Sequence, residues 1–345
     1  MNGGLLKVTC TVVVSTVIGW ILYIGRPVLV PIAFGVIVTY VVYGIANLFQ
    51  RIPYIGSKLS VGMRCSIAIA LMVVAIFVSI DLLISDRDRL LALAPRYQAT
   101  LLALVGKIAA VLQAQTEPTW ESIRRDILDK VNIQSIVTAT LASLSGLIVT
   151  VCVVALYTAF LLVEHGRFRR RLARIADNPA AMHVVAVVNE INAKIGMYLA
   201  LKALLGVIVG LLSWVCMRMV GLELAELWAI LIAILNFVPY IGSAVSVALP
   251  TLIAALQFGQ WDEVLLVFAL LSVLNFVVGN LVDPYLMGES LNLSPFVILV
   301  SVAVWSSIWG VAGAFLAVPI TVGLVIGFSS FESTRPISIL LTNKD

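Results

Sequence analysis

Apolar and polar residues follow one another along the chain in long blocks, and the apolar blocks are the first guide to its fold. Several of these blocks hold about 20 apolar residues, the length that an α-helix needs to cross the hydrocarbon core of a bilayer. They lie at residues 5–25, 28–50, 63–84, 139–163, 199–219 and 264–283. The pattern therefore predicts an all-α polytopic membrane protein with about six full transmembrane helices.

Two further apolar blocks are too long to be single spans. The run between Glu226 and Asp262 contains no charged residue, and neither does the run between Glu289 and Glu332. As straight helices these runs would measure roughly 52 and 63 Å, against a hydrocarbon core of about 30 Å. Each run has helix breakers near its middle, so it forms either two full spans or a hairpin. We predict two re-entrant helical hairpins, with a full crossing as the alternative for the second run. The predicted hairpins cover 228–257 and 294–329.

The two predicted hairpins indicate a transport core with internal symmetry. We expect the first hairpin to enter from the outside and the second from the cytoplasm, a shape typical of an inverted repeat with a site at the midplane. Unwound backbone at membrane depth needs protein or a water-filled cavity to satisfy its N–H and C=O groups. We therefore expect the bend at Pro239 to leave main-chain amides without hydrogen-bond partners in the protein. These amides would face a water-filled cavity where a polar solute can bind.

Two polar segments separate the apolar blocks. Residues 86–138 mix both signs of charge with apolar positions at helical spacing, which predicts a pair of amphipathic helices broken at 116–119. Packing on the membrane domain or on neighbouring copies is the ordinary role of such helices, and a substrate-capturing cap is the alternative. Residues 164–197 begin with a basic run and predict a helix that lies on the cytoplasmic leaflet.

The pattern divides the chain into four parts. The first three transmembrane helices occupy 1–85, and an extracytoplasmic amphipathic insertion occupies 86–138. The fourth span and the basic interfacial helix occupy 139–197, and the transport core with both hairpins fills 198–345. Lysines and arginines gather after the second and fourth spans. This marks both loops, and with them the N-terminus and the C-terminus, as cytoplasmic.

Composition agrees with a membrane location and argues against several other classes. Hydrophobic residues make up 61% of the chain and charged residues 12%, and the mean hydropathy is +1.10. Soluble domains are roughly half apolar and a quarter charged. The net charge of +4 is scattered, so we expect no nucleic-acid partner. Nucleotide-phosphate, zinc-hydrolase and serine-hydrolase motifs are missing from the sequence, so we expect no cofactor, no metal and no enzyme activity.

Polar side chains near the first predicted bend are the main candidates for binding a solute. Asn236 stands one turn before Pro239, where its amide would satisfy carbonyls that the proline leaves without a donor, or coordinate a substrate hydroxyl. Tyr240, Gly242 and Ser243 continue the same bend. We predict that these residues line one cavity.

A second group of candidates ends the sixth predicted span. Asn280 and Asp283 stand at i and i+3 on one helix face, and Asn275 lies further up the helix. Ionisable groups at membrane depth are costly and usually face a cavity or a partner, so Asp283 is a candidate for contacting an ion or a substrate. The alternative is that it caps a break at Pro284. Lys202 is the second ion-coupling candidate, as a partner of Asp283, although such lysines normally extend to the headgroups.

The C-terminal half also carries the motifs of a known family. It contains LWAILIAILNFVPYIGS and, further on, GNLVDPYLMGESLNLSPFVILVSVAVWSSIWGVAGAFLAVPITV. In these motifs and their order the chain resembles the autoinducer-2 exporter (AI-2E) family of bacterial inner-membrane transporters, most strongly over roughly 185–335. The motif positions of the family fall here on Asn236, Pro239, Gly242, Asn280, Pro284, Gly288, Ser294 and Pro295.

The resemblance implies a function and a set of partners. It implies export of a small polar furanone-type signal, autoinducer-2, which serves quorum sensing, across the inner membrane. Some members of the family are described as sodium or lithium/proton antiporters, which makes coupling to sodium or protons the alternative. The family also implies a homo-oligomer, for which a pentamer is one candidate, embedded among membrane lipids. A non-transporting membrane scaffold is a third hypothesis, which the two predicted backbone breaks disfavour.

Overall fold

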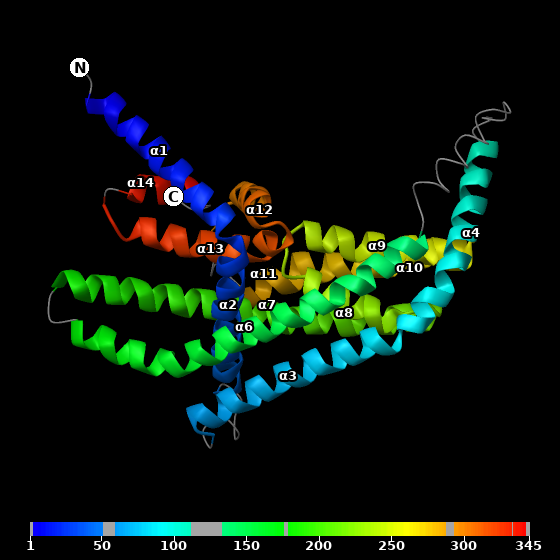
Figure 1. Cartoon of the computed structure of the whole chain (residues 1–345), viewed down its shortest axis with the longest axis horizontal. Helices are drawn as coiled ribbons and strands as arrows, with labels where there is room; N and C mark the ends of the chain where they lie inside the picture. Colours follow the sequence, from blue (N-terminus) through cyan, green and yellow to red (C-terminus); the bar gives the residue numbers. More distant parts are fainter. Residues whose placement is uncertain are drawn as a thin grey trace. The chain divides into compact units, whose positions relative to one another are not determined.

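The computed structural model of the chain describes residues 3–50, 59–111, 133–175, 179–287, 293–332 and 334–342. Regular structure in these ranges is helical, apart from an isolated β-bridge between Leu293 and Thr342. The prediction of an all-α fold is therefore confirmed. The helices are labelled in Figure 1. Their bounds are α1 Gly3–Ile24, α2 Arg26–Gln50, α3 Val61–Ser85, α4 Arg87–Val111, α6 Ile133–Ile175, α7 Pro179–Val220, α8 Ala225–Leu235, α9 Ile241–Phe258, α10 Trp261–Val277, the π-helix η1 Val278–Val282, α11 Asp283–Met287, α12 Pro295–Trp309, α13 Val311–Ser329 and α14 Arg335–Leu341.

Within the described ranges, 6 helical stretches are long and apolar enough to cross a membrane. Those that coincide with predicted spans are α2, α3, Met182–Val220 of α7, and Trp261–Leu286, which joins α10, η1 and α11. The predicted spans at 5–25 and 139–163 correspond to shorter apolar stretches, Thr9–Ile24 and Ile148–Glu164. The remaining long stretches are α9 and α13, the second arms of the predicted hairpins. The chain is a multi-pass membrane protein.

The helices are grouped into two compact units. The first unit combines Met1–Ala68, Thr150–Lys202 and Met287–Asp345, and the second combines Ile69–Val149 and Ala203–Leu286. Helices α3, α6 and α7 contribute to both units. Helices α8, α9 and α10 belong wholly to the second unit, and α12, α13 and α14 belong wholly to the first.

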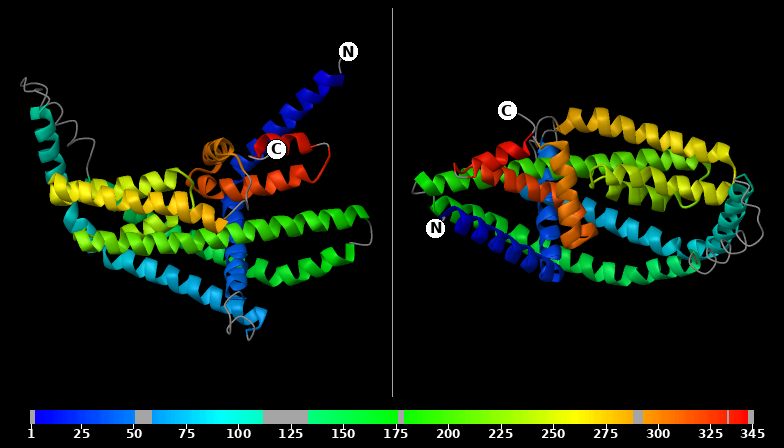
Figure 2. Two further views of the ribbon diagram at one scale, coloured as in Figure 1. Left: turned by 180° about the vertical axis from the view of Figure 1, so that it is seen from behind. Right: turned by 90° about the horizontal axis from the view of Figure 1, so that it is seen from above.

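In the second unit, α8 and α9 form a helical hairpin and α10 packs along α9, as Figures 1 and 2 show. The sequence explains the break between α8 and α9, because Pro239 has no backbone N–H and disfavours helical backbone at the residue before it. Gly259, with a φ of 65°, ends α9, and the chain turns through Gln260 into α10. Both turns are thus specified locally, by residues that cannot easily continue a helix.

In the first unit, α12 and α13 form the second helical hairpin. Its turn is Gly310, whose φ of 62° and ψ of −141° favour glycine. The indole N–H of Trp309 donates to the carbonyl of Leu22 at 2.9 Å, among the last carbonyls of α1, which lack partners within their own helix. Both predicted breaks are thus confirmed as helical hairpins. Entry and exit on one face of a membrane stays a prediction.

The two polar segments also contain long helices. Helix α4 supplies the first part of the predicted amphipathic pair, and the predicted break at 116–119 lies outside the described residues. Helix α6 extends through the basic run to Ile175, and α7 continues without interruption from Pro179 into the predicted fifth span. The placement of these helices relative to the lipid stays a prediction.

Candidate functional site

Backbone hydrogen bonds close the turn of the first hairpin, which covers residues 236–240. The N–H of Val238 donates to the carbonyl of Leu235 at 2.9 Å, and the N–H of Gly242 donates to the carbonyl of Val238 at 2.9 Å. The expectation that main-chain amides lie bare at this bend is therefore wrong for these groups, because short turns satisfy them locally. Side chains are left as the groups that can bind a solute.

The turn also contains a strained residue. The N–H of Ile241 donates to the carbonyl of Pro239 at 2.6 Å, which makes a γ-turn centred on Tyr240. Tyr240 has a φ of 60° and a ψ of −57°. This form of γ-turn is rare and strained, and strain of this kind concentrates at ligand clamps and switch regions.

Asn236 places its amide between the hairpin and α7. Its Nδ2 is buried and makes no hydrogen bond. A β-carbon added to Gly206 of α7 would lie 3.8 Å from this nitrogen. A buried donor without an acceptor costs roughly 1–3 kcal/mol, so an incoming acceptor would stabilise it. Among the neighbouring candidates, Tyr240 and Ser243 are exposed and Gly242 is buried.

The antiparallel packing of α9 and α10 brings the second group of candidates to the same end of this unit as the turn. At 1.5 Å per residue, Ser243 and Asn275 lie about 25 and 23 Å from the α9–α10 turn, so they stand at nearly one level. The Nδ2 of Asn275 donates to the carbonyl of Leu271 at 2.9 Å. Asn280 is exposed, and its Nδ2 donates to the carbonyl of Phe276 at 3.0 Å. Both side chains therefore present an amide oxygen as acceptor.

Asp283 follows directly after the π-helix η1 and begins α11. It is half-buried and belongs to the second unit. Pro284 is exposed in the first turn of α11, where a proline is tolerated. Lys202 is buried and belongs to the first unit, so its pairing with Asp283 stays a prediction.

The remaining motif residues belong mainly to the second hairpin. Ser294 is the residue before α12, and Pro295 occupies its first position, where the missing N–H costs no hydrogen bond. The N–H of Ser294 donates to the carbonyl of Leu341 at 3.3 Å. Gly288 lies outside the described residues. Ser294 and Pro295 thus shape the start of the hairpin.

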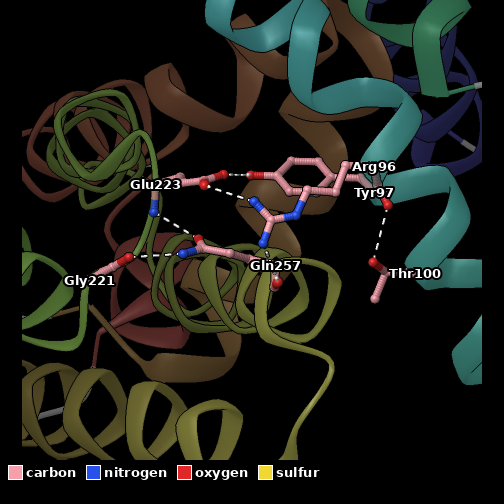
Figure 3. Close-up of polar contacts among 6 residues, drawn as sticks. All are labelled: Arg96, Tyr97, Thr100, Gly221, Glu223 and Gln257. Atoms are coloured by element: carbon pink, nitrogen blue, oxygen red, sulfur yellow. Dashed lines mark hydrogen bonds and ion pairs between the residues drawn. The ribbon is translucent and has the colours of Figure 1, made fainter.

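A polar cluster that the sequence analysis missed joins α4 to the base of the first hairpin (Figure 3). Gln257, near the end of α9, accepts a hydrogen bond from the N–H of Glu223 and donates one to the carbonyl of Gly221, each at 2.8 Å. The carboxylate of Glu223 accepts from the Arg96 guanidinium at 3.3 Å and from the Tyr97 hydroxyl at 3.2 Å. We call these four side chains, Arg96, Tyr97, Glu223 and Gln257, the polar clamp.

The hydrogen bonds and the ion pair of the polar clamp differ in how strongly they restrain the loop before α8. Burial raises the pKa of Tyr97, and the charge and the hydrogen bond of Glu223 raise it further, so the hydroxyl stays protonated and donates. The Arg96 and Glu223 side chains are 57% and 33% exposed, so solvent screens their ion pair. Gln257 is buried, and both ends of its amide are used. Hydrogen bonding by Gln257 is therefore the main restraint on the loop that precedes α8.

A pocket of about 380 Å³ opens beside the polar clamp, and Arg89, Arg218, Glu223 and Glu226 line it. Its charges are largely matched within the protein. The Nε of Arg218 lies 3.6 Å from Oε1 of Glu226, and the indole of Trp214 donates to the same oxygen at 3.1 Å. Because these charged groups already have partners, we keep the hairpin turn as the candidate solute site.

Comparison with known proteins agrees with this architecture. Multi-pass helices interrupted by backbone breaks are typical of secondary transporters. Residues 11–329 match the family described as AI-2E family transporter, so the chain belongs to the AI-2E family of transporters. The family resemblance found in the sequence is confirmed.

Relatives cover most of the chain at moderate identity. The chain is 28% identical over 278 residues to "Putative transport protein YhhT" of Escherichia coli (strain K12). The aligned residues cover 80% of this chain and 78% of that protein. It is 27% identical over 282 residues to "AI-2 transport protein TqsA" of the same strain, which is 81% of this chain and 80% of that protein. It is also 30% identical over 189 residues to "Putative permease PerM" of that strain, 54% of this chain and 53% of that protein.

Proposed function

We propose that the chain exports a small, neutral, hydroxyl-rich signalling molecule of the autoinducer-2 type across the bacterial inner membrane. The observation that carries the proposal is the buried Nδ2 of Asn236, which makes no hydrogen bond beside the turn of the first hairpin. A solute hydroxyl would accept from this donor, and Ser243 and Asn275 would supply further neutral partners. Membership of the transporter family, and the name of the relative TqsA, support a solute of this class.

The proposal includes a topology and an assembly. Both hairpins are re-entrant, the first from the outside and the second from the cytoplasm, and both termini are cytoplasmic. Only 6% of the apolar window of α3 is buried within the chain, so its side chains need lipid or another copy as neighbours. We propose a homo-oligomer, with a pentamer as one candidate, in which neighbouring copies cover part of this surface. Native mass spectrometry from lipid nanodiscs would give the subunit number, and a single-chain mass would contradict it.

A counterflow assay on purified protein in liposomes tests the proposed solute. Labelled furanone-type signal should exchange across the membrane in the presence of the protein, without any cofactor. Asn236→Leu keeps the branched shape of the side chain but removes its donor, so the initial rate should fall by about tenfold. Gln260→Leu is the matched control, because this amide is exposed in the turn between α9 and α10. Equal rates for wild type and Asn236→Leu would reject Asn236 as a solute contact.

Exchange of sodium or lithium for protons is a second candidate function, which the π-helix before Asp283 favours. Single π-turns are rare and frequently occur at functional sites. Here the Asp283 carboxylate would bind the metal cation and the proton alternately, and Lys202 is the second ion-coupling candidate. In vesicles loaded with a pH dye, a sodium-driven pH change that Asp283→Asn abolishes would support antiport. Solute counterflow without a pH change would support the export function instead.

A further inference from the structure

Helix α8 is bracketed by strained backbone. Among the described residues, Leu224 with a φ of 57° and Tyr240 with a φ of 60° are the non-glycine residues with positive φ. Leu224 directly precedes α8, and Tyr240 ends the turn that follows it. Such conformations cost roughly 1–3 kcal/mol each and are typical of hinges and switch segments. The strain thus falls at the residue before α8 and at the residue before α9, on either side of the 11-residue helix and its turn.

Helices α7 and α8 approach each other closely at two glycines of α7. β-Carbons added to Gly206 and Gly210 of α7 would lie 2.7 Å from the carbonyl of Ala233 and 2.9 Å from the carbonyl of Ala229. Small residues at this spacing let two helix backbones touch without interlocking side chains. At these two positions α7 has no side chain that would block a movement of α8.

Buried polar atoms on these elements lack partners. Ser213 Oγ on α7, Trp228 Nε1 on α8 and Asn236 Nδ2 in the turn are buried and make no hydrogen bond. Native structures satisfy most such groups, and an exception calls for an explanation such as stored strain, a functional role, or a bound water or ion. The observed position of α8 therefore leaves hydrogen-bonding capacity unused on both α7 and α8.

Hydrogen bonds hold the loop at the N-terminal end of α8 in place. Gln257 bonds to both Gly221 and Glu223, just ahead of Leu224, and the Glu223 carboxylate is bonded in turn by α4. Gly221 itself has a φ of 82°, so the restrained loop has two residues in left-handed conformations. A restrained loop at one end and a strained turn at the other are the parts that a pivoting helix requires.

We propose that α8 is a moving gate of the transporter, which pivots against α7 about residues 221–224 while the polar clamp sets the balance between two positions. Gln257 and Glu223 are positioning residues in this scheme, since they act on the solute site only through α8. The tip of α8 carries Asn236, so the pivot would change the access of a solute to that amide. This part of the scheme rests on the proposed export function, whereas the two positions of α8 do not.

Distances between two spin labels test the two positions without any substrate. One label replaces Ile234 on α8 and the other replaces Leu265 on α10, both exposed, in a background where Cys10, Cys65, Cys152 and Cys216 are alanine. Double electron–electron resonance in liposomes should give two distances for this pair. Labels at Leu252 on α9 and Val273 on α10, also exposed, form the control pair and should give one distance.

Substitutions at the clamp and at the strained residues should move the balance in opposite directions. Gln257→Leu removes both hydrogen bonds that hold the loop, so the second distance should gain about tenfold in relative population. Leu224→Gly and Tyr240→Gly remove the cost of positive φ in the observed position, so the second distance should lose about fivefold. Glu223→Gln keeps the side-chain shape and should act as a weaker form of Gln257→Leu, in case the latter does not fold.

The outcomes separate this inference from the proposed function. Two distances with opposite shifts support the pivot, even if no furanone-type solute is transported. One distance in every variant overturns the pivot, even if counterflow is normal. Shifts in the same direction for Gln257→Leu and Leu224→Gly also overturn it, because a general loosening of the fold would produce them. If the pivot also serves transport, Gln257→Leu changes the maximal counterflow rate more than the half-saturating concentration.

Discussion

Gly242 meets Leu235 across the turn of the first hairpin so closely that a β-carbon on Gly242 would lie 1.9 Å from the Leu235 carbonyl oxygen. The constraint is steric and comes from the approach of two backbones, which no side-chain rotamer can relieve. Position 242 therefore requires a residue without a β-carbon. The turn that this close approach fixes contains Asn236 and Tyr240.

Gly242→Ala should open the turn of the first hairpin and destabilise the protein. Moving the two backbones apart in a packed region typically costs about 1–3 kcal/mol. The thermal unfolding midpoint of the purified protein in detergent should fall clearly, and counterflow should be lost. Gly279→Ala is the matched control, because a β-carbon at Gly279 would meet nothing within 4 Å. Equal midpoints for both variants would show that the close approach has no energetic weight.

The second hairpin should respond in the same way at Gly313. A β-carbon there would lie 1.8 Å from the carbonyl oxygen of Trp305. Gly313→Ala should therefore lower the unfolding midpoint, whereas Gly327→Ala on the same helix should not, because its β-carbon would meet nothing within 4 Å. A stable Gly313→Ala variant would contradict the tight packing of α12 on α13.

Trp309→Phe should destabilise the first unit by a smaller amount. The substitution keeps an aromatic ring but removes the hydrogen bond to the carbonyl of Leu22, which is worth about 1 kcal/mol. The unfolding midpoint should fall modestly relative to wild type. Trp261→Phe serves as a control, because Trp261 is exposed at the start of α10. A larger loss for the control would show that indole removal itself, and not this hydrogen bond, matters.

The stabilisation from the polar clamp should not change with rising pH up to the usual pKa of tyrosine. Burial and Glu223 raise the pKa of Tyr97 above its usual value of 10.0. A raised pKa means that the stabilisation from this hydroxyl is complete below pH 10 and is lost only as the pH rises through the shifted value. Difference absorbance spectra of wild type and Tyr97→Phe should show one tyrosine that ionises late. An ionisation at or below pH 10 would contradict the contact with Glu223.

Local signals in the sequence predicted the breaks but not the contacts between helices. Pro239 and Gly310 act on their own backbone, so the two hairpins could be located from the sequence. Gly206 with Gly210, and Gly323 with Gly327, form two G-x-x-x-G pairs that look alike in sequence. β-Carbons on the first pair would meet the backbone of α8 at Ala233 and Ala229, whereas one on Gly323 would make an ordinary 3.6 Å contact with Ile195 and one on Gly327 would meet nothing within 4 Å. The partner helix decides which pair packs, and a single sequence does not contain that information.

The polar clamp was missed for the same reason. Gln257 lies near the end of α9 and Glu223 lies in the loop between α7 and α8, and each has an ordinary interpretation as a solvated polar residue. Arg96 lies more than a hundred residues away, in a segment whose charges are typical of an exposed amphipathic helix. The expectation of unbonded amides at Pro239 was wrong for a different reason. A γ-turn and neighbouring short turns satisfy backbone groups that a simple helix break would expose.

Gln257 should contribute more to stability than the ion pair in the same cluster. Gln257→Leu removes its hydrogen bonds to the N–H of Glu223 and to the carbonyl of Gly221, each worth about 1 kcal/mol. Arg96→Met removes an ion pair whose partners are 57% and 33% exposed, which is worth under about 1 kcal/mol. The unfolding free energy from detergent titration should therefore be clearly lower for Gln257→Leu than for Arg96→Met.

In a double-mutant cycle, Arg96→Met with Glu223→Gln should show a coupling energy that weakens in high salt, because salt screens exposed charges. A salt-independent coupling larger than the Gln257→Leu effect would instead make the ion pair the main anchor of α4.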